Sequence, residues 1–168
     1  MIPAMHFDAP IVIDTGETVQ PGWIDYNDHM NVAFYLLAFD QALDRLYDRV
    51  GMGRAYRQQT NFSTMTLESH ICYLRELTLG DPLRFTFHLL DHDAKRQHFF
   101  GSMYHAKDDY LAATHEWLTT HVDLAARRST EMPPDRVAIF SSMHEAHRTL
   151  PRPDRAGQII GIRRNPTA

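Results

Sequence analysis

The amino-acid sequence predicts an α+β domain in which a curved antiparallel sheet of about five strands wraps around one long central helix. Residues 31–50 contain no Pro or Gly, and Gly51 and Gly53 follow at once, which is typical of a helix and its C-terminal end. Further along, hydrophobic side chains alternate with polar ones, as they do in half-buried strands. The chain has 168 residues, 43% of them hydrophobic, which suits a single domain with its own core.

The other elements can be placed in chain order. Two short extended segments come first, broken around Thr15–Gly16 and bent at Pro21–Gly22; they cover residues 11–13 and 17–24. After the helix the alternation predicts strands at 65–73, 83–89, 97–106 and 110–122, with turns at 80–82 and 107–109. A second helix is expected at 135–148, followed by an irregular tail. We therefore expect one domain over residues 1–168, with its core at about 11–124 and a C-terminal helix and tail at 134–168.

The two halves of the long helix differ in composition. Residues 32–39 are all apolar, which predicts a helix end that is buried on every side. The second half is amphipathic, with one polar stripe made of Asp40, Gln41, Asp44, Arg45, Asp48 and Arg49. We expect one end of the helix to lie deep in the fold and the other to reach solvent.

Charge and composition exclude several classes of function. The formal net charge is -4, so a broad basic surface for nucleic acid is not expected. Cys72 is the single cysteine, so no internal disulfide can form, which fits a reducing compartment. No apolar run approaches the ~20 residues that span a bilayer, and residues 1–10 do not resemble a signal peptide. We expect a cytoplasmic protein with no membrane partner.

The most informative segment lies just before the long helix. Asp25 precedes His29 and Asn31, and the apolar helix begins directly after them. A carboxylate in this position lies beside the unpaired backbone N–H groups of a helix N-terminus, which can hold a developing oxyanion. Asp25 is therefore a candidate general base or nucleophile toward a thioester, or else a turn aspartate. Asn31 is most simply the N-cap, and His29 either binds substrate or forms a structural hydrogen bond.

Other candidate motifs are weaker. The alternation at 65–73 places Glu68 on one face with Thr66 and His70, where it can serve acid–base chemistry or pair with an Arg. Glu116 between His115 and Trp117 is a similar case. There is no Gly-x-Ser-x-Gly elbow, phosphate loop or dinucleotide motif. The pair His144 and His147 lacks the spacing of a zinc helix, so we expect no metal site, and Cys72 is expected to be inert.

These residues resemble a known family. DYNDHMNVAFYL at residues 25–36 and YLRELTLGDPL at 73–83 are similar, in this order, to two motifs of hot-dog fold thioesterases of the 4-hydroxybenzoyl-CoA thioesterase type. The resemblance covers about residues 19–122. It implies a hot-dog fold, Asp25 as the catalytic carboxylate, and a helix N-terminus that polarises the thioester carbonyl. The family usually has Gly where Asp28 stands and often Asn where Val32 stands.

A closer resemblance is to the betainyl-CoA thioesterases that are associated with, or fused to, L-carnitine dehydrogenase. LESHICYLRE at 67–76, DAKR at 93–96 and HVD at 121–123 carry it, together with residues 25–31. It implies hydrolysis of the glycine betaine thioester in carnitine metabolism, with coenzyme A as part of the substrate and no other cofactor. A trimethylammonium group is best held by aromatic faces and nearby negative charge. We expect the catalytic residues to be Asp25, His29 and Asn31. We expect the substrate to be bound by aromatic and acidic residues around them, namely Trp23, Tyr26, Asp28, Tyr35, Glu68, Tyr73 and Trp117.

Two other functions stay open from the sequence. A hot-dog hydratase or dehydratase would use a His on the helix-entry loop paired with an acid, which His29 and Glu68 could imitate. A non-catalytic acyl-CoA-binding module would lack a usable carboxylate, against which Asp25 argues. One helix inside an open sheet leaves a free sheet edge, and edges of this kind pair with a second copy. We expect a homodimer or homotetramer with the site at the subunit boundary.

Overall fold

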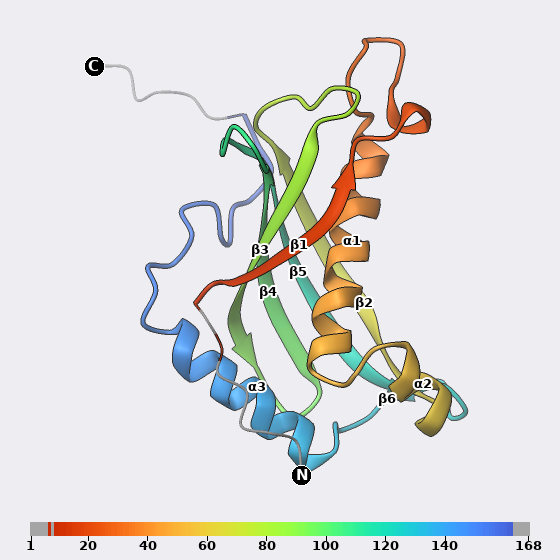
Figure 1. Cartoon of the computed structure of the whole chain (residues 1–168). Coiled ribbons are helices and arrows are strands. Elements are labelled where there is room, and N and C mark those ends of the chain that lie inside the picture. The colour runs from red at the N-terminus through yellow and green to blue at the C-terminus, as the bar shows by residue number, and fades with distance from the viewer. Residues whose placement is uncertain (1–6, 8, 163–168) are drawn as a thin grey trace.

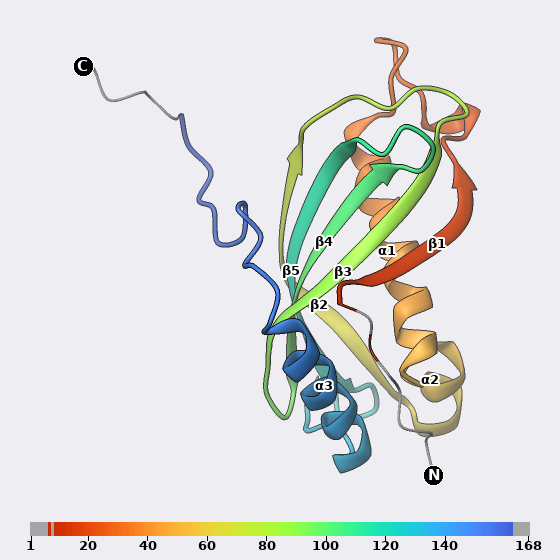
Figure 2. The ribbon, with the colours of Figure 1, turned by 60° about the vertical axis from the view of Figure 1, so that its left-hand side comes forward.

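The computed structural model describes residue 7 and residues 9–162, so both chain ends of the expected 1–168 domain lie partly outside the described residues, as does most of the 1–10 segment. A curved sheet encloses one long helix (Figures 1 and 2). The elements in chain order are β1 (Ile11–Thr18), the 3-10 turn η1 (Pro21–Trp23), α1 (Val32–Arg49), α2 (Arg54–Thr60), β2 (Phe62–Tyr73), β3 (Pro82–His92), β4 (Arg96–His105), β5 (Leu111–Asp123), β6 (Arg128–Ser129) and α3 (Pro134–His147). The predicted α+β architecture is confirmed.

The sheet is antiparallel throughout, with the strand order β1-β3-β4-β5-β2, and the short β6 pairs with β5. Consecutive strands β3, β4 and β5 form a meander, as expected. β2 does not join β3 across the turn at Gly80, because it pairs with β5 at the far side of the sheet. β1 and β2 are consequently the two edge strands, and no sequence pattern indicated which strand would be the outer neighbour of β5.

Helix α1 begins where the sequence predicts. The side chain of Asn31 accepts a hydrogen bond from the Ala33 backbone N–H, which makes it the N-cap. One side of the helix packs into the hollow of the sheet through its buried residues Tyr35, Ala38, Phe39, Ala42, Leu43, Leu46 and Tyr47. The prediction that residues 32–39 are buried on every side is wrong. Val32, Leu36 and Leu37 are 58%, 45% and 39% exposed, because the sheet contacts only one side of the helix while the apolar run covers all of its sides.

The N-terminal segment also differs from the prediction. β1 is one strand across Thr15–Gly16, with an irregular register between Asp14 and Thr18. Gly16 has φ +66, a conformation that glycine adopts freely and that allows such a bulge without ending the strand. The expected strand end at 21–24 is the 3-10 turn η1, in which Pro21 takes the first position and Trp23 is buried.

A close contact in the sheet positions a large core side chain. Trp117 on β5 lies over Gly101 on β4, and a Cβ atom at Gly101 would stand 2.9 Å from Trp117 Cζ3 and 3.2 Å from Phe39 Cε1. Glycine inside a strand often marks such a close approach. The rings of His115 and Phe99 stack on Trp117, with centroids 4.6 and 5.7 Å away, so both partners extend the aromatic layer under α1.

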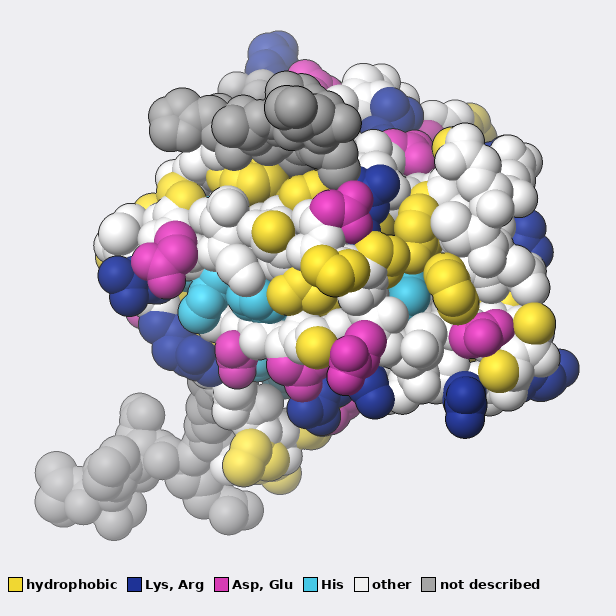
Figure 3. Space-filling model, turned by 90° about the horizontal axis from the view of Figure 1, so that it is seen from below, with side chains coloured by type: hydrophobic (Ala, Val, Ile, Leu, Met, Phe, Trp, Pro, Cys, Tyr) yellow, Lys and Arg dark blue, Asp and Glu magenta, His cyan; other side chains and the backbone are white. Residues whose placement is uncertain are grey.

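The C-terminal part packs on the lower end of the sheet. The ring of Phe140 on α3 meets Phe99, and the Leu89 backbone N–H donates to His147 Nδ1 at 2.8 Å. The tail then returns along the sheet, where the Gly157 N–H donates to Glu116 Oε2 at 2.6 Å. Figure 3 looks onto the end with α2, α3 and β6, where basic side chains are spread around the rim among acidic ones. No helix in the described part of the chain is long and apolar enough to cross a membrane.

Candidate active site at the start of helix α1

Asp25 lies in a short closed loop that leads into α1. Ile24 and Met30 form an isolated antiparallel bridge, and the Asp25 N–H donates to the His29 carbonyl at 3.0 Å. The carboxylate is held within the loop, because Asp25 Oδ1 accepts the Asn27 N–H at 2.8 Å. Asp25 is thus fixed across the loop from His29, and His29 lies two residues before the N-cap Asn31. The other carboxylate oxygen, Oδ2, has no hydrogen-bond partner among the described residues.

The loop needs one unusual backbone conformation. Asp28 has φ +62, and its N–H donates to the Asp25 carbonyl at 3.1 Å. Among residues with a Cβ, Asp and Asn enter this left-handed region most easily. The thioesterases that the sequence resembles usually have Gly at this position. The positive φ of the turn gives a physical reason for that preference, because glycine adopts this conformation without strain.

The first turn of α1, which follows this loop in the chain, offers a backbone donor. The Ala33 N–H is taken by the Asn31 side chain and the Phe34 N–H by the Asn31 carbonyl at 3.0 Å. In the described part of the chain the Val32 N–H has no partner. The Tyr73 hydroxyl donates to the Val32 carbonyl at 3.3 Å and so ties the end of β2 to this turn. A free N–H at a helix N-terminus is suited to an oxyanion.

His29 has an acidic partner, but it is not Glu68. His29 Nε2 lies 3.1 Å from Glu76 Oε2; the His29 side chain is 40% exposed and that of Glu76 is 63% exposed. Glu68 is on the other side of the sheet, because the register between β2 and β5 shifts between Thr66 and Glu68. Thr66 pairs with Thr119 and faces α1, whereas Glu68 pairs with Leu118 and faces away. The prediction of a shared face for Thr66 and Glu68 is therefore wrong, and a bulge at Leu67 is the reason.

The five aromatic residues expected in one cleft do not gather in one chain. Trp23 is buried and stacks on Phe34 with centroids 5.7 Å apart, and Tyr26 is 94% exposed. Tyr35 and Tyr73 meet edge to face at 5.2 Å, next to the first turn of α1. Burial raises the pKa of Tyr35 to about 12, opposed by a hydrogen bond from the Leu77 backbone, so its hydroxyl stays protonated. Trp117 on β5 lies further from the start of α1 and lines a separate pocket.

We call this pocket the upper pocket; it opens between α1 and β2 with a volume of about 440 Å³. The pocket is lined by the exposed side of α1 and by the facing sides of β2 and β5. The main lining residues are Leu36, Leu37, Asp40, Ser69, His115 and Trp117. Sequence reasoning missed Asp40, Ser69 and His115 as a group, because Ser69 and His115 meet only through the β2–β5 pairing and Asp40 joins them only where α1 packs against these strands. The alternation of Ser69 and Ile71 with outward-facing residues was the one available signal.

His115 is the buried polar residue of the upper pocket. Its Nε2 lies 2.6 Å from Ser69 Oγ, and its Nδ1 has no partner among the described residues; the same is true of Trp117 Nε1. Burial lowers the pKa of His115 to about 4, with a smaller contribution from His70. His115 is therefore uncharged at neutral pH.

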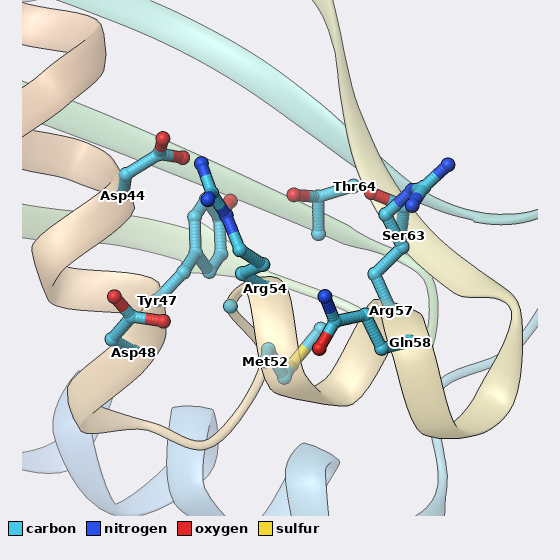
Figure 4. A pocket seen from close by; sticks show the side chains of 10 residues that line it. Asp44, Tyr47, Asp48, Met52, Arg54, Arg57, Gln58, Ser63 and Thr64 are labelled. Atoms are coloured by element: carbon cyan, nitrogen blue, oxygen red, sulfur yellow. The ribbon is translucent and has the colours of Figure 1, made fainter.

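A second cavity, the lower pocket, of about 670 Å³, lies toward the C-terminal end of α1. Residues of α1 and β2 line both pockets, and we call the stretch between these two elements the groove. Figure 4 shows charged side chains around it, with Asp44 and Asp48 on α1 and Arg54 and Arg57 on α2. Arg54 reaches toward Asp44, and Ser63 and Thr64 on β2 form the far wall. Burial, together with Asp40 and Asp48, raises the pKa of Asp44, which Arg54 partly offsets.

Metal-ligating side chains do not converge in the described part of the chain. No group of three or more His, Cys, Asp or Glu residues there could hold a metal ion. His147 is occupied by the Leu89 N–H, and Cys72 lies on β2 with His70 Nε2 at 3.9 Å from its sulfur.

Comparison with known proteins places this fold and loop in a family. The model of the thioesterase-like superfamily matches residues 19–140. The chain belongs to the thioesterase-like superfamily. As a member of this superfamily it has the hot-dog fold and is a thioester hydrolase.

Two sequence relatives share the resemblance to the carnitine-linked branch of the superfamily. The chain is 37% identical over 152 residues to a betainyl-CoA thioesterase of Pseudomonas aeruginosa, which covers 90% of this chain and 96% of the relative. It is also 37% identical over 165 residues to an L-carnitine dehydrogenase/betainyl-CoA thioesterase of Rhizobium meliloti. That match covers 96% of this chain but 33% of the relative, so the chain corresponds to one part of a larger protein.

A solved structure is also similar over nearly the whole chain. A hypothetical protein of Staphylococcus aureus, solved in complex with CoA, is 28% identical with a TM-score of 0.84. The match covers 95% of this chain and all of that one. The expected hot-dog fold is thereby confirmed.

Proposed function

We propose that the chain hydrolyses a small acyl-CoA, with betainyl-CoA as its substrate in carnitine catabolism. The observation that carries the proposal is the closed loop from Ile24 to Met30, which fixes the Asp25 carboxylate in the segment that leads directly to the open Val32 N–H. The 37% identity to a betainyl-CoA thioesterase over 90% of the chain supports the acyl group. The complex of the Staphylococcus aureus protein with CoA supports coenzyme A as the thiol part of the substrate.

The reaction needs a nucleophile and a site for the oxyanion. In one form, Asp25 takes a proton from water while the water oxygen bonds to the thioester carbon. In the other, Asp25 itself attacks this carbon, and water cleaves the resulting anhydride after the CoA thiolate has left. In both forms the carbonyl oxygen gains negative charge that the Val32 N–H and the helix dipole stabilise. The C–S bond then breaks, and the CoA thiolate leaves and takes up a proton. His29 and Asn31 serve this site by holding the loop and capping the helix.

The proposal includes a dimer that completes the site. β2 is an edge strand, and it exposes Met65, Leu67 and Tyr73 by 51%, 57% and 50%. The exposed apolar side of α1, with Leu36 and Leu37, is on the same side of the molecule as this edge. A second copy paired at β2 would cover both surfaces, as free edges and contiguous apolar patches favour. Light scattering at micromolar concentration should give about twice the chain mass of 19.5 kDa, or a multiple; a monomer would contradict it.

The proposed activity is tested by release of free thiol from a panel of CoA esters. The panel contains acetyl-CoA, betainyl-CoA, 4-hydroxybenzoyl-CoA and 3,3-dimethylbutyryl-CoA, which has the branching of betainyl-CoA without its charge. We expect betainyl-CoA to exceed this neutral ester by at least ~10-fold in kcat/KM, about 1.4 kcal/mol. Equal rates would leave a general acyl-CoA thioesterase. Binding of CoA esters without thiol release would indicate a binding module instead.

A hydratase is the second candidate, favoured by the His29–Glu76 pair on the helix-entry loop. It predicts that an enoyl-CoA loses its conjugated absorbance without release of thiol. Thiol release alone, with no change in an enoyl-CoA, supports the hydrolase.

A further inference from the structure

The upper pocket lies directly beside the proposed site of the thioester carbonyl. Ala33, which lines the pocket, follows Val32, whose N–H is open. Leu36 and Leu37 come one turn later, about 6 Å further along the helix axis at ~1.5 Å per residue. An acyl group attached to a carbonyl at Val32 therefore reaches the pocket without leaving the groove.

We propose that the upper pocket receives the acyl group and that Asp40 makes it select a quaternary ammonium group by charge. This inference rests on the proposed function and adds the residue that determines its specificity. Asp40 lies on the rim of the pocket, and no Lys or Arg is among the described residues that line it.

The charge of Asp40 is not neutralised by a neighbour. None of the ion pairs in the described part of the chain includes Asp40. Asp44 and Asp48 follow on the same side of α1 at successive turns, so three carboxylates form a column along the groove. Arg54 reaches toward Asp44 and compensates the lower end of this column (Figure 4). The rim of the upper pocket therefore keeps a negative field.

The floor of the pocket is compatible with a cation that donates no hydrogen bond. His115 carries no charge at neutral pH because it is buried, so it does not repel an ammonium group. Ser69 fixes the imidazole through its contact of 2.6 Å with Nε2. His115 Nδ1 and Trp117 Nε1 are also buried, without a hydrogen-bond partner among the described residues.

Aromatic stacking, by contrast, does not explain cation selection here. Trp117 is 2% exposed, and its indole already stacks with the rings of His115 and Phe99. A trimethylammonium group gains most from an open ring face, which Trp117 does not present. The carboxylate column also repels phosphate groups, so the nucleotide end of CoA must leave the site in another direction.

The test compares two esters that differ only in charge, betainyl-CoA and 3,3-dimethylbutyryl-CoA. We expect Asp40→Asn to lower kcat/KM for betainyl-CoA by about 3- to 10-fold, and Asp40→Lys to lower it further, while the neutral ester changes less than ~2-fold. Asp48→Asn is the matched control, two turns or ~12 Å further along α1, and should leave both esters within ~2-fold. The Asp40→Asn effect should shrink as salt rises, because salt screens a charge at a distance.

A second variant tests the pocket by size and not by charge. Ser69→Leu fills the space in front of His115, so both branched esters should lose at least ~10-fold in kcat/KM while acetyl-CoA is retained. Light scattering and a thermal unfolding curve show whether each variant keeps its assembly and fold. An unchanged ratio of the two branched esters in both Asp40 variants overturns the inference while the thioesterase stands. A wild-type protein that cleaves no CoA ester overturns the proposed function first, and the inference with it.

Discussion

The two ends of the groove along α1 differ in the groups that line them. At the upper end, the site consists mainly of backbone features, namely a closed loop, a residue with positive φ and a helix N-terminus, together with the Asp25 carboxylate. At the lower end, charged side chains of both signs surround a larger cavity. The groove thus runs from a loop suited to polarise a carbonyl, past Asp40 on the rim of the upper pocket, to an end where Arg54 offsets part of the acidic charge. Reactivity and selectivity can therefore come from separate parts of one surface.

Asp25→Asn tests the upper end with the largest expected effect. The variant keeps the shape and the hydrogen bond from the Asn27 N–H but removes the negative charge, so kcat should fall by roughly 10²-fold or more, about 2.7 kcal/mol in the barrier. Asp48→Asn removes the same charge at the lower end and serves as control, with kcat within ~2-fold. The measurement is steady-state thiol release with matched thermal unfolding curves. Near wild-type turnover by Asp25→Asn would remove Asp25 from the chemistry.

Gly101→Ala tests how far the upper pocket depends on close packing. The new Cβ would lie 2.9 Å from the Trp117 ring and 3.2 Å from Phe39, so the indole or the strand must shift. We expect a loss of about 2 kcal/mol in the free energy of unfolding, within the range for an overfilled core. Urea unfolding measures it, with Gly22→Ala as control, because nothing lies within 4 Å of a Cβ built at Gly22. Equal stability of the two variants would mean that the Trp117 layer is loosely packed.

His115→Phe tests the buried neutral imidazole of the upper pocket. Burial lowers the folded-state pKa to about 4, whereas the unfolded chain binds a proton near pH 6.5. Stability from this group is therefore present above pH 6.5 and lost as the pH falls toward 4. Between pH 7.5 and 5.5 the wild type should lose about 1 kcal/mol more than His115→Phe. Urea unfolding at both pH values measures the difference, and an equal loss in both proteins would show that His115 is charged in the fold.

The sequence predicts features that are local in the chain, and the structure supplies those that are not. The helix from Val32, its Asn31 cap and the alternating β3 strand all depend on neighbours within a few residues, and all are confirmed. The face of Glu68 was predicted wrongly, because a bulge at Leu67 inverts the alternation and leaves no mark in the residue pattern. The position of β2 beside β5 could not be predicted either, because it is a pairing between segments that are distant in the sequence.

The candidate site divides in the same way. Asp25, His29 and Asn31 are close in sequence, and the loop brings them together. Ser69 and His115 are 46 residues apart and meet only across paired strands, so no spacing rule could find them. The exposed side of α1 could not be predicted either, because an apolar run does not tell a side covered by the sheet from a side left for another surface.

Asp28→Gly has the smallest expected effect and asks whether the loop uses the side chain or only the backbone. Asp28 holds φ +62, which glycine adopts without strain, while its greater freedom in the unfolded chain offsets the gain. The free energy of unfolding should therefore stay within about 0.5 kcal/mol, whereas Asp28→Ala should lose about 1 kcal/mol because alanine is strained there. If the loop is a backbone device, Asp28→Gly keeps kcat and kcat/KM for both the charged and the neutral ester. A selective loss with betainyl-CoA in both variants would instead place the Asp28 carboxylate among the groups that attract the cation, and the separation of reactivity from selectivity along the groove would no longer hold.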